Sequence, residues 1–317
     1  MTPQAYETLL VTGSSGFVGR HLLRRLREGP DGPKRTVALD LRDEGSCPGG
    51  DFVKCDLTDP SAVGAVMDEL CPDGVIHLAG VTGSDDARAC FNANVLACEN
   101  LLAAAAELPR PPRVLVVGSA AQYGLTAGER EVVDETRPLL GTTAYAVSKT
   151  LQEKWALLRG AAGEVPVICV RPFNIMGPGQ PDSLVPAAFL QQVADVLDGR
   201  AGEVRVGNLD SQRDFTDVRD VAAAMWALMS AGRRADGQVF NIASGAAVKI
   251  ADMLQACIAL TGRQIAVRQD RDRRKAVDVP TIIGEASRLR NVTGWRPQVT
   301  WQQSLTDMWT EMRRPAP

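Results

Sequence analysis

The stretch LLVTGSSGFVGR, residues 9–20, decides the fold. It opens with an apolar run typical of a buried strand and passes through glycines at 13, 16 and 19 into residues 18–27, an amphipathic segment typical of a helix. Glycines three residues apart permit a tight turn, and the helix start that follows can bind a diphosphate through its N–H groups. The spacing differs from the general G-x-G-x-x-G pattern, and a purely structural turn could use the same glycines. Their position between strand and helix favours a dinucleotide site, with contacts from Gly13, Ser15, Gly16, Phe17, Val18 and Gly19.

Short apolar runs alternate with helical patterns along most of the chain. The predicted strands are 9–11, 36–39, 74–78, 114–117, 165–170 and 238–242. The predicted helices are 18–27, 59–70, 92–107, 145–158 and 217–229. Strands that are apolar throughout are typical of parallel strands covered on both faces. The alternation therefore predicts an α/β fold, a Rossmann doubly wound parallel sheet.

The alternation becomes irregular after Arg171, where prolines and glycines accumulate. We predict an NAD(P)-binding Rossmann domain over residues 1–172 and 213–245. Residues 173–212 and 246–317 are then expected to form a smaller α/β substrate-binding lobe. In this division the last predicted strand, 238–242, returns to the first sheet.

Composition excludes several classes of function. The 317 residues include 35 Lys and Arg against 38 Asp and Glu, a net charge of −3, so no global field attracts nucleic acid or an anionic membrane. Apolar runs such as 101–106 are much shorter than the ~20 residues that span a bilayer. The N-terminus has no signal-peptide pattern. Seven scattered cysteines without a C-x-x-C pair, and two histidines, predict no metal site, no disulfide framework and a cytoplasmic location.

Two acidic residues extend the predicted cofactor site. Asp40 ends the second strand, where a carboxylate can bind the adenosine ribose and repel a 2′-phosphate, so NAD is favoured over NADP. Arg42 could reverse that preference, and a solvated strand end would also suit Asp40. Asp56 is placed for an adenine contact or for the N-cap of the next helix.

Tyr145 and Lys149 are four residues apart in YAVSK and therefore share a helix face. A tyrosine has a pKa of about 10 in water, too high for a base at neutral pH, and a nearby ammonium lowers that value. Lys149 could also hold a ribose hydroxyl. Taken alone, the pattern fits an ordinary surface pair equally well.

The order of these features resembles the extended short-chain dehydrogenase/reductases, the NAD-dependent epimerase/dehydratase family, over essentially the whole chain. In that family a Ser or Thr four residues before a Tyr-Gly shares the substrate hydroxyl proton with the catalytic tyrosine. Here the stretch is SAAQYG, residues 119–124. The resemblance implies that Ser119, Tyr145 and Lys149 are catalytic, and that NAD or NADP is the cofactor. His77, in HLAG at the end of a strand, is expected to be structural.

The resemblance also implies further cofactor contacts at the ends of the strands. These are Asp40, Leu41, Arg42, Asp56, Leu57, Leu78, Ala79, Gly80, Tyr145, Lys149 and Pro172.

Motifs in the carboxyl half narrow the resemblance. RPFNIMGPGQ at 171–180 and RDFTDVRDV at 213–221, with VGNL and FNIASG, are most similar to reductases of GDP-4-keto-6-deoxymannose that form GDP-rhamnose. By that resemblance Asn174 contacts the sugar nucleotide and Arg213 its diphosphate, for which an Arg fork is suited. A salt bridge with Asp214 or Asp217 is the alternative for Arg213. Where such enzymes carry R-x-x-E this chain has KAVD, and it lacks a His after Asn174. The implied substrate contacts are Thr82, Ser119, Ala120, Ala121, Asn174, Val185, Val206, Arg213, Lys275 and Asp278.

Residues 120 and 121 discriminate between the reactions of the family. Both are alanine, so the acid or base of a 4,6-dehydratase is missing, as is the cysteine of an epimerase-reductase of the GDP-fucose synthase type. We therefore predict NAD(P)H-dependent reduction of the 4-keto group of a nucleotide-linked 6-deoxy-4-ketohexose. A nucleotide-sugar 4-epimerase with tightly bound NAD is the alternative. A non-catalytic NAD(P) sensor is a second alternative, disfavoured because Ser119, Tyr145 and Lys149 are all present.

Quaternary structure is predicted from the same resemblance. Family members commonly dimerise through the helices that correspond to 92–107 and to the one carrying Tyr145. We expect a homodimer, although an alanine-rich helix could instead pack on the sheet of its own chain.

Overall fold

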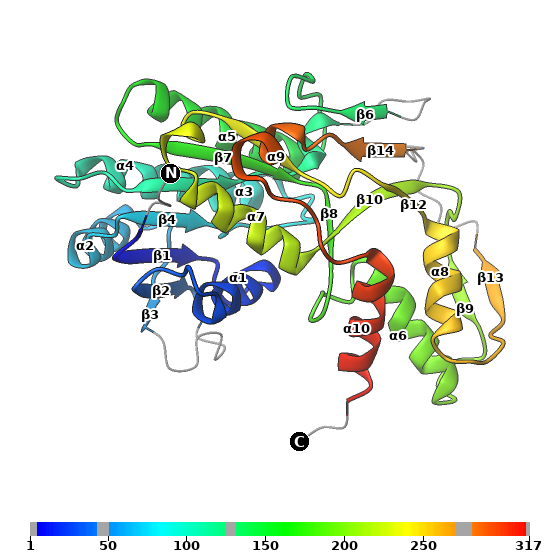
Figure 1. Ribbon diagram of the computed structural model, residues 1–317. Coiled ribbons are helices and arrows are strands. Elements are labelled where there is room, and N and C mark those ends of the chain that lie inside the picture. Colours follow the sequence, from blue (N-terminus) through cyan, green and yellow to red (C-terminus); the bar gives the residue numbers. More distant parts are fainter. Residues whose placement is uncertain (1–4, 43–50, 125–130, 271–280, 315–317) are drawn as a thin grey trace.

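The computed structural model describes residues 5–42, 51–124, 131–270 and 281–314. Its centre is a seven-stranded parallel sheet in the order β11-β7-β5-β4-β1-β2-β3 (Figure 1). The strands are β1 (Thr8–Thr12), β2 (Arg35–Asp40), β3 (Asp51–Lys54), β4 (Gly74–His77), β5 (Arg113–Val117), β7 (Val167–Pro172) and β11 (Val239–Ile242). Because the order reverses at β1, the ends of β1 and β4 form the crevice where doubly wound folds bind their ligands. The predicted Rossmann sheet is confirmed.

Helices cover both faces of this sheet, as its continuously apolar strands require. One face packs on α1 (Phe17–Glu28), α7 (Val218–Ser230) and α9 (Ser287–Thr293), and the other on α2 (Pro60–Leu70), α4 (Ala97–Glu107) and α5 (Ala144–Ala161). Each layer has its own apolar core. The sheet is therefore shielded from water except at its ends, and the strand ends remain to build a site.

A second sheet forms the smaller lobe. It has the order β12-β10-β14-β6, with β8 also paired to β10, and a separate pair joins β13 to β9. The strands of the lobe are β6 (Glu131–Val133), β8 (Asn174–Met176), β9 (Val204–Val206), β10 (Gln212–Asp217), β12 (Ala247–Lys249), β13 (Val267–Gln269) and β14 (Thr281–Gly284). A third apolar core joins this lobe to α6 (Val185–Leu197), α8 (Ile250–Ala259) and α10 (Trp301–Met312), which lie together in Figure 1.

The chain passes between the two sheets more than once. β11 pairs with β7 in the first sheet, as expected for the strand predicted at 238–242. β6 and β10 both pair with β14 in the second sheet, although β6 falls within 1–172 and all of β10 after Gln212 falls within 213–245. These two strands therefore belong with the lobe's sheet, and the division into two domains remains a proposal.

One strand of the main sheet, β3, was not predicted from the sequence. β3 has only four residues, with a charged residue at each end, and pairs with β2 at the edge. Short polar edge strands give little apolar signal, which explains the omission. The strand predicted at 165–170 begins at Val167, directly after Pro166.

The helix predicted at 92–107 has an irregular first half. It is preceded by α3 (Ala87–Cys90) and is π-helical over η1 (Phe91–Leu96) before α4 begins. Among the described helices, the run Ala87–Glu107 is long and apolar enough to cross a bilayer by length and composition alone. In the structure this run packs on α2 and α5, with Cys98, Leu101 and Leu102 in the core. Packing within the fold thus accounts for part of its apolar composition.

Candidate active site

The glycine turn joins β1 to α1 and needs glycine at two of its positions. Gly13 has φ +68°, and a Cβ there would lie 2.6 Å from the backbone nitrogen of Ala79. A Cβ on Gly19 would collide with the carbonyl oxygen of Gly13. These glycines allow β1, α1 and the segment after β4 to approach one another closely.

The start of α1 fits a diphosphate. Its N-cap, Gly16, makes no side-chain hydrogen bond to the first turn, and no acidic residue lies in that turn. The N–H groups of the first helical turn are therefore available to an anion, which the helix dipole also favours. A bulkier turn would fill this space, so the residues present suit the diphosphate of a dinucleotide.

The end of β2 is tied to the glycine turn. Asp40 accepts a hydrogen bond from the backbone N–H of Ser15 at 3.0 Å through one carboxylate oxygen and from Leu41 at 2.7 Å through the other. The Ser15 hydroxyl lies 3.5 Å from the carbonyl oxygen of Arg42. Asp40 is half-buried rather than a fully solvated strand end, and it sets the position of the turn beside it.

Asp56 follows β3, and its carboxylate accepts hydrogen bonds from the backbone N–H and the hydroxyl of Thr58. These bonds hold the pKa of Asp56 below its usual range. The N-cap of α2 is Asp59, which accepts from Ser61 and Ala62. The helix is therefore capped by Asp59, and not by Asp56 as the alternative prediction had it.

The segment after β4 carries Leu78, Ala79 and Gly80 along the glycine turn. His77 is fully buried, its Nδ1 lies 2.8 Å from the hydroxyl of Thr12, and burial lowers its pKa to about 3. A neutral buried imidazole bonded to β1 is a structural group, as expected from the sequence. Gly80 has φ +157°, and a Cβ there would lie 3.5 Å from the Lys149 amine.

The side chains of Ser119 and Tyr145 lie near each other, and interaction with Ser119 lowers the pKa of Tyr145. Ser119 is the N-cap of a short 3₁₀ helix, η2 (Ala120–Tyr123), and Tyr145 lies in the first turn of α5. Burial raises the pKa of Tyr145, the interaction with Ser119 lowers it, and the nearby Cys90 raises it again. The interaction with Ser119 therefore favours the phenolate, the form in which Ser119 donates.

Lys149 lies one helical turn after Tyr145 and is almost fully buried. Its amine donates to the carbonyl oxygen of Val117 at 2.9 Å and to Oε1 of Gln152 at 2.8 Å. Burial lowers its pKa to about 8. The helix pair predicted from YAVSK is thus an inward-facing pair beside Gly80, rather than a pair on the surface.

Three buried polar side chains at this site were missed by the sequence reasoning. Asn94, in the π-helical segment, bonds the backbone of Val81 and donates to the hydroxyl of Ser148 at 2.9 Å. Gln122 is also buried, beside Ser119, and Glu153 is buried on α5. A signal existed: Asn94 interrupts an apolar stretch, and Glu153 is four residues after Lys149 on the same helix face.

Four of the predicted substrate residues that the structure describes lie at the lobe: Asn174, Val185, Val206 and Arg213. Asn174, on β8, is exposed and donates to the carbonyl oxygen of Asp214 at 2.9 Å. The carboxylate of Asp214 accepts from the Ser244 hydroxyl and from the backbone of residues 244, 245 and 284. Asp217 pairs with Arg219 at 2.8 Å. Both aspartates suggested as alternatives for Arg213 therefore have other partners, and Arg213 itself donates to the carbonyl oxygen of Gln212.

The other substrate predictions differ in exposure. Thr82, Ala121 and Val185 are exposed, Ala120 is half-buried, and the Val206 side chain lies in the lobe's core. Lys275 and Asp278 lie outside the described residues. Substrate contacts by all of these residues remain predictions.

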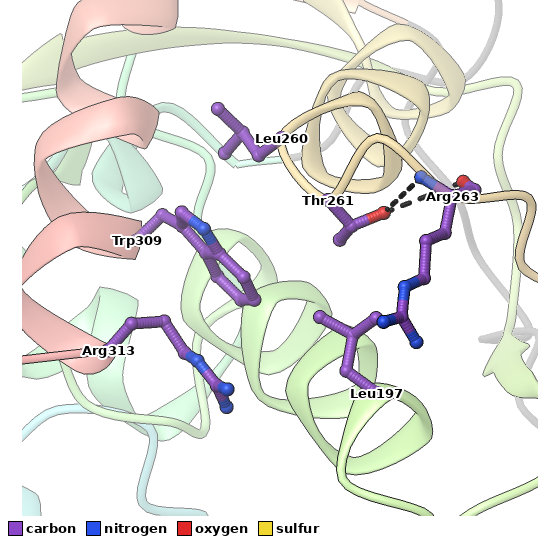
Figure 2. Close-up of a pocket in the computed structure, with 6 residues that line it drawn as sticks. All are labelled: Leu197, Leu260, Thr261, Arg263, Trp309 and Arg313. Atoms are coloured by element: carbon purple, nitrogen blue, oxygen red, sulfur yellow. Dashed lines mark hydrogen bonds between the residues drawn. The ribbon is translucent and has the colours of Figure 1, made fainter.

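A hollow elsewhere in the lobe is a separate feature (Figure 2). It has a volume of about 360 Å³ and is formed by residues on or just after α6, α8 and α10. Its lining consists of Leu197, Leu260, Thr261, Arg263, Trp309 and Arg313. None of these residues is a predicted site residue. Within the described ranges, no cluster of His, Cys, Asp and Glu has the arrangement of a metal site.

Comparison with known proteins agrees with this geometry. A model of the NAD dependent epimerase/dehydratase family matches residues 9–243. The chain is 34% identical over 305 residues to GDP-6-deoxy-D-mannose reductase of Pseudomonas aeruginosa, covering 94% of this chain and 95% of the relative. It is 29% identical to GDP-6-deoxy-D-talose 4-dehydrogenase of Aggregatibacter actinomycetemcomitans, covering 90% and 91%.

A solved structure is similarly close. RMD from Pseudomonas aeruginosa complexed with NADPH superposes with a TM-score of 0.83 at 32% identity, covering 97% of this chain and 100% of the other. The cofactor of the family is NAD or NADP, as the resemblance implied, and the glycine turn had predicted a dinucleotide site. The resemblance drawn from the sequence motifs is confirmed: the chain belongs to the NAD dependent epimerase/dehydratase family.

Proposed function

We propose that this protein reduces the 4-keto group of a nucleotide-linked 6-deoxy-4-ketohexose to a hydroxyl, with NAD(P)H as the reductant. The observation that carries the proposal is the placement of Ser119 next to Tyr145, with the buried Lys149 one helical turn away. Ala120 and Ala121, next to Ser119, carry no acid or base that could remove a proton from the sugar ring. The site therefore offers the groups that a ketone reduction needs, and no group at these positions for dehydration.

Bound NAD(P)H would supply the hydride that reduces the C4 carbonyl carbon, and would be released as NAD(P)⁺. Tyr145 donates its hydroxyl proton to the carbonyl oxygen, so that one hydride and one proton together convert the ketone to the alcohol. Ser119 donates a hydrogen bond to the same oxygen as negative charge develops on it. The Lys149 ammonium stabilises the phenolate left behind, which regains its proton from solvent.

We propose a GDP-linked sugar as the substrate, because the names of both curated relatives refer to GDP-linked 6-deoxyhexoses. Arg213 and Asn174 would then bind the nucleotide part. An Arg fork matches a diphosphate, and an amide can both donate and accept. Asp40 favours NAD over NADP in this proposal, since its carboxylate would repel a 2′-phosphate.

We also propose a homodimer built on α5 and the helical run before α4. Four apolar side chains on α5 are between 43% and 58% exposed, namely Val147, Leu151, Trp155 and Leu158. Their spacing of four, four and three residues places them on one face of the helix. Phe91 and Leu96 are exposed on the neighbouring segment. Together they form an apolar surface that a second copy would cover.

We place the enzyme in the cytoplasm as part of the proposal. All the cysteines that the structure describes have free thiols, and most are buried in the core. Free thiols without a disulfide framework suit a reducing compartment.

The test combines cofactor oxidation with product analysis. The purified protein is given GDP-4-keto-6-deoxymannose with NADH or NADPH, and absorbance at the nicotinamide band is followed. Mass spectrometry should find a product two hydrogen masses heavier than the substrate. Nucleotide released on denaturation is identified in parallel: tightly retained NAD with interconversion of two hydroxyl epimers would point to the 4-epimerase. If the protein oxidised neither NADH nor NADPH and bound no sugar nucleotide, the proposal would be refuted.

A further inference from the structure

The side chain of Gln122 bridges two parts of the active site. It is fully buried, its Oε1 accepts from the backbone N–H of Ser119 at 2.7 Å, and its Nε2 donates to Oε2 of Glu153 at 2.9 Å. Ser119 caps η2, whereas Glu153 lies on α5, the helix of Tyr145 and Lys149. One amide thus joins the turn that carries Ser119 to the helix that carries the other two residues.

The far end of this bridge is fixed. Arg171, on β7, donates to both carboxylate oxygens of Glu153 at 2.6 and 2.7 Å, and both side chains are buried. Burial acts against the charged guanidinium, but the bonds and charge of Glu153 raise the pKa of Arg171 above its ordinary value. A bidentate buried pair is a rigid anchor, because its geometry is set by two parallel hydrogen bonds. Gln122 is therefore attached to the sheet as well as to α5.

The near end of the bridge needs such support. η2 has four residues, and so short a 3₁₀ helix has little stability of its own. The Ser119 hydroxyl oxygen accepts from the backbone N–H of Ala121 at 3.1 Å, which leaves its hydrogen free to donate toward Tyr145. A rotation of η2 would move this hydroxyl away. Gly118 fits the same arrangement, since a Cβ there would collide with Oε1 of Gln122.

We propose that Gln122 and Glu153 are positioning residues, which hold the Ser119 hydroxyl in line with Tyr145 and the substrate carbonyl. This inference rests on the proposed reductase function, since it assigns the bridge to that reaction. The bridge acts through Ser119 and touches neither substrate nor cofactor. Its loss should therefore lower kcat and leave the KM for the sugar nucleotide almost unchanged.

The main variant is Gln122→Leu, which keeps the volume and removes both hydrogen bonds. We expect kcat to fall about 10- to 100-fold, because displacing a catalytic group by about 1 Å costs that much. Gln122→Glu is a second variant of nearly identical shape, in which two carboxylates face each other. Adding Glu153→Gln to it restores a donor and an acceptor between the two residues, and should recover part of the lost kcat.

A double-mutant cycle separates positioning from general destabilisation. If Gln122 acts only through Ser119, adding Gln122→Leu to Ser119→Ala should lower kcat no further. Tyr6→Phe is the matched control: it removes a buried hydroxyl that donates to the Met229 carbonyl, on an element without site residues. It should lower stability without lowering kcat. Full additivity in the cycle, or equal losses of kcat in Tyr6→Phe, would overturn the inference.

A cofactor-free readout completes the test. The chain has three tyrosines, so tyrosinate absorbance can be titrated and the Tyr145 component identified by its absence in Tyr145→Phe. The interaction with Ser119 lowers the pKa of Tyr145. Gln122→Leu should therefore move this component to higher pH, as Ser119→Ala should, and an unmoved component would contradict positioning. If the wild type turned over no nucleotide sugar, the proposed function would fail while this titration still decided the role of the bridge.

Discussion

The backbones of Gly13 and Ala79 lie so close that a Cβ on Gly13 would come within 2.6 Å of the Ala79 nitrogen. Gly13 also has φ +68°, a conformation that costs residues with a side chain about 1–2 kcal/mol. Gly13→Ala would therefore separate the glycine turn from the segment that ends in Gly80. We expect a lower melting temperature and at least a tenfold weaker affinity for NAD(P)H, measured by nicotinamide fluorescence.

Gly163→Ala provides the control for this prediction. Gly163 has φ +75°, but nothing lies within 4 Å of its Cβ position. Gly163→Ala therefore has the free-energy cost of a positive φ without a clash at the added Cβ. Equal losses of cofactor affinity in the two variants would show that the contact with Ala79 is unimportant.

Tyr145→Phe removes the proposed proton donor and keeps the ring. We expect kcat to fall by about 10²- to 10⁴-fold, the usual contribution of a positioned acid or base. The affinity for NAD(P)H should change little, because the glycine turn and Lys149 remain. Stopped-flow binding and steady-state rates measure the two effects, and an unchanged kcat would contradict the assigned role of Tyr145.

Lys149 gives a pH dependence with a definite sign. Burial lowers its pKa to about 8, so its ammonium is lost as the pH rises past that value. We expect kcat/KM for NAD(P)H, which reports the free enzyme, to fall above about pH 8. The profile is measured from pH 7 to pH 10, and a kcat/KM that stayed constant over this range would contradict the prediction.

Stability measurements assign that titration to Lys149. Between about pH 8 and its ordinary value of 10.5 the folded amine holds fewer protons than the unfolded one, so the free energy of unfolding should rise with pH in this window. Lys149→Met should lack this rise. Urea unfolding at several pH values compares the two proteins.

Asp40→Asn tests the coenzyme preference. The amide oxygen can still accept from Ser15, whereas the negative charge that would repel a 2′-phosphate is gone. We expect the ratio of kcat/KM for NADPH to that for NADH to rise about tenfold, about 1.4 kcal/mol. If the ratio were unchanged, Arg42 or another group would set the preference.

Leu158→Asp tests the proposed dimer. Leu158 is 58% exposed on the apolar face of α5, so a carboxylate there would be buried without a partner in a dimer. If the proposed dimer is correct, sedimentation velocity should find a dimer for the wild type and a monomer for Leu158→Asp. Val132→Asp, on β6 and 60% exposed, is the control that should leave the dimer intact.

Local sequence was enough for the architecture. Apolar strands, a glycine turn and amphipathic helices identified six strands of the main sheet, because each carries its signal within a few adjacent residues. β3 was missed because four residues with charged ends carry no such signal. The relation of β6 and β10 to the second sheet was also beyond local patterns, since their partners are distant in the chain.

The candidate site divides in the same way. The sequence by itself predicted the glycine turn, Asp40, Tyr145 and Lys149, because their spacing reports a local geometry at a strand end or on one helix face. The family resemblance added Ser119. Only the tertiary structure decided that Gln122 joins Ser119 to Glu153, and that Arg171 anchors them. Hydrogen bonds between residues far apart in the chain depend on how three elements pack, and burial alone makes such bonds obligatory.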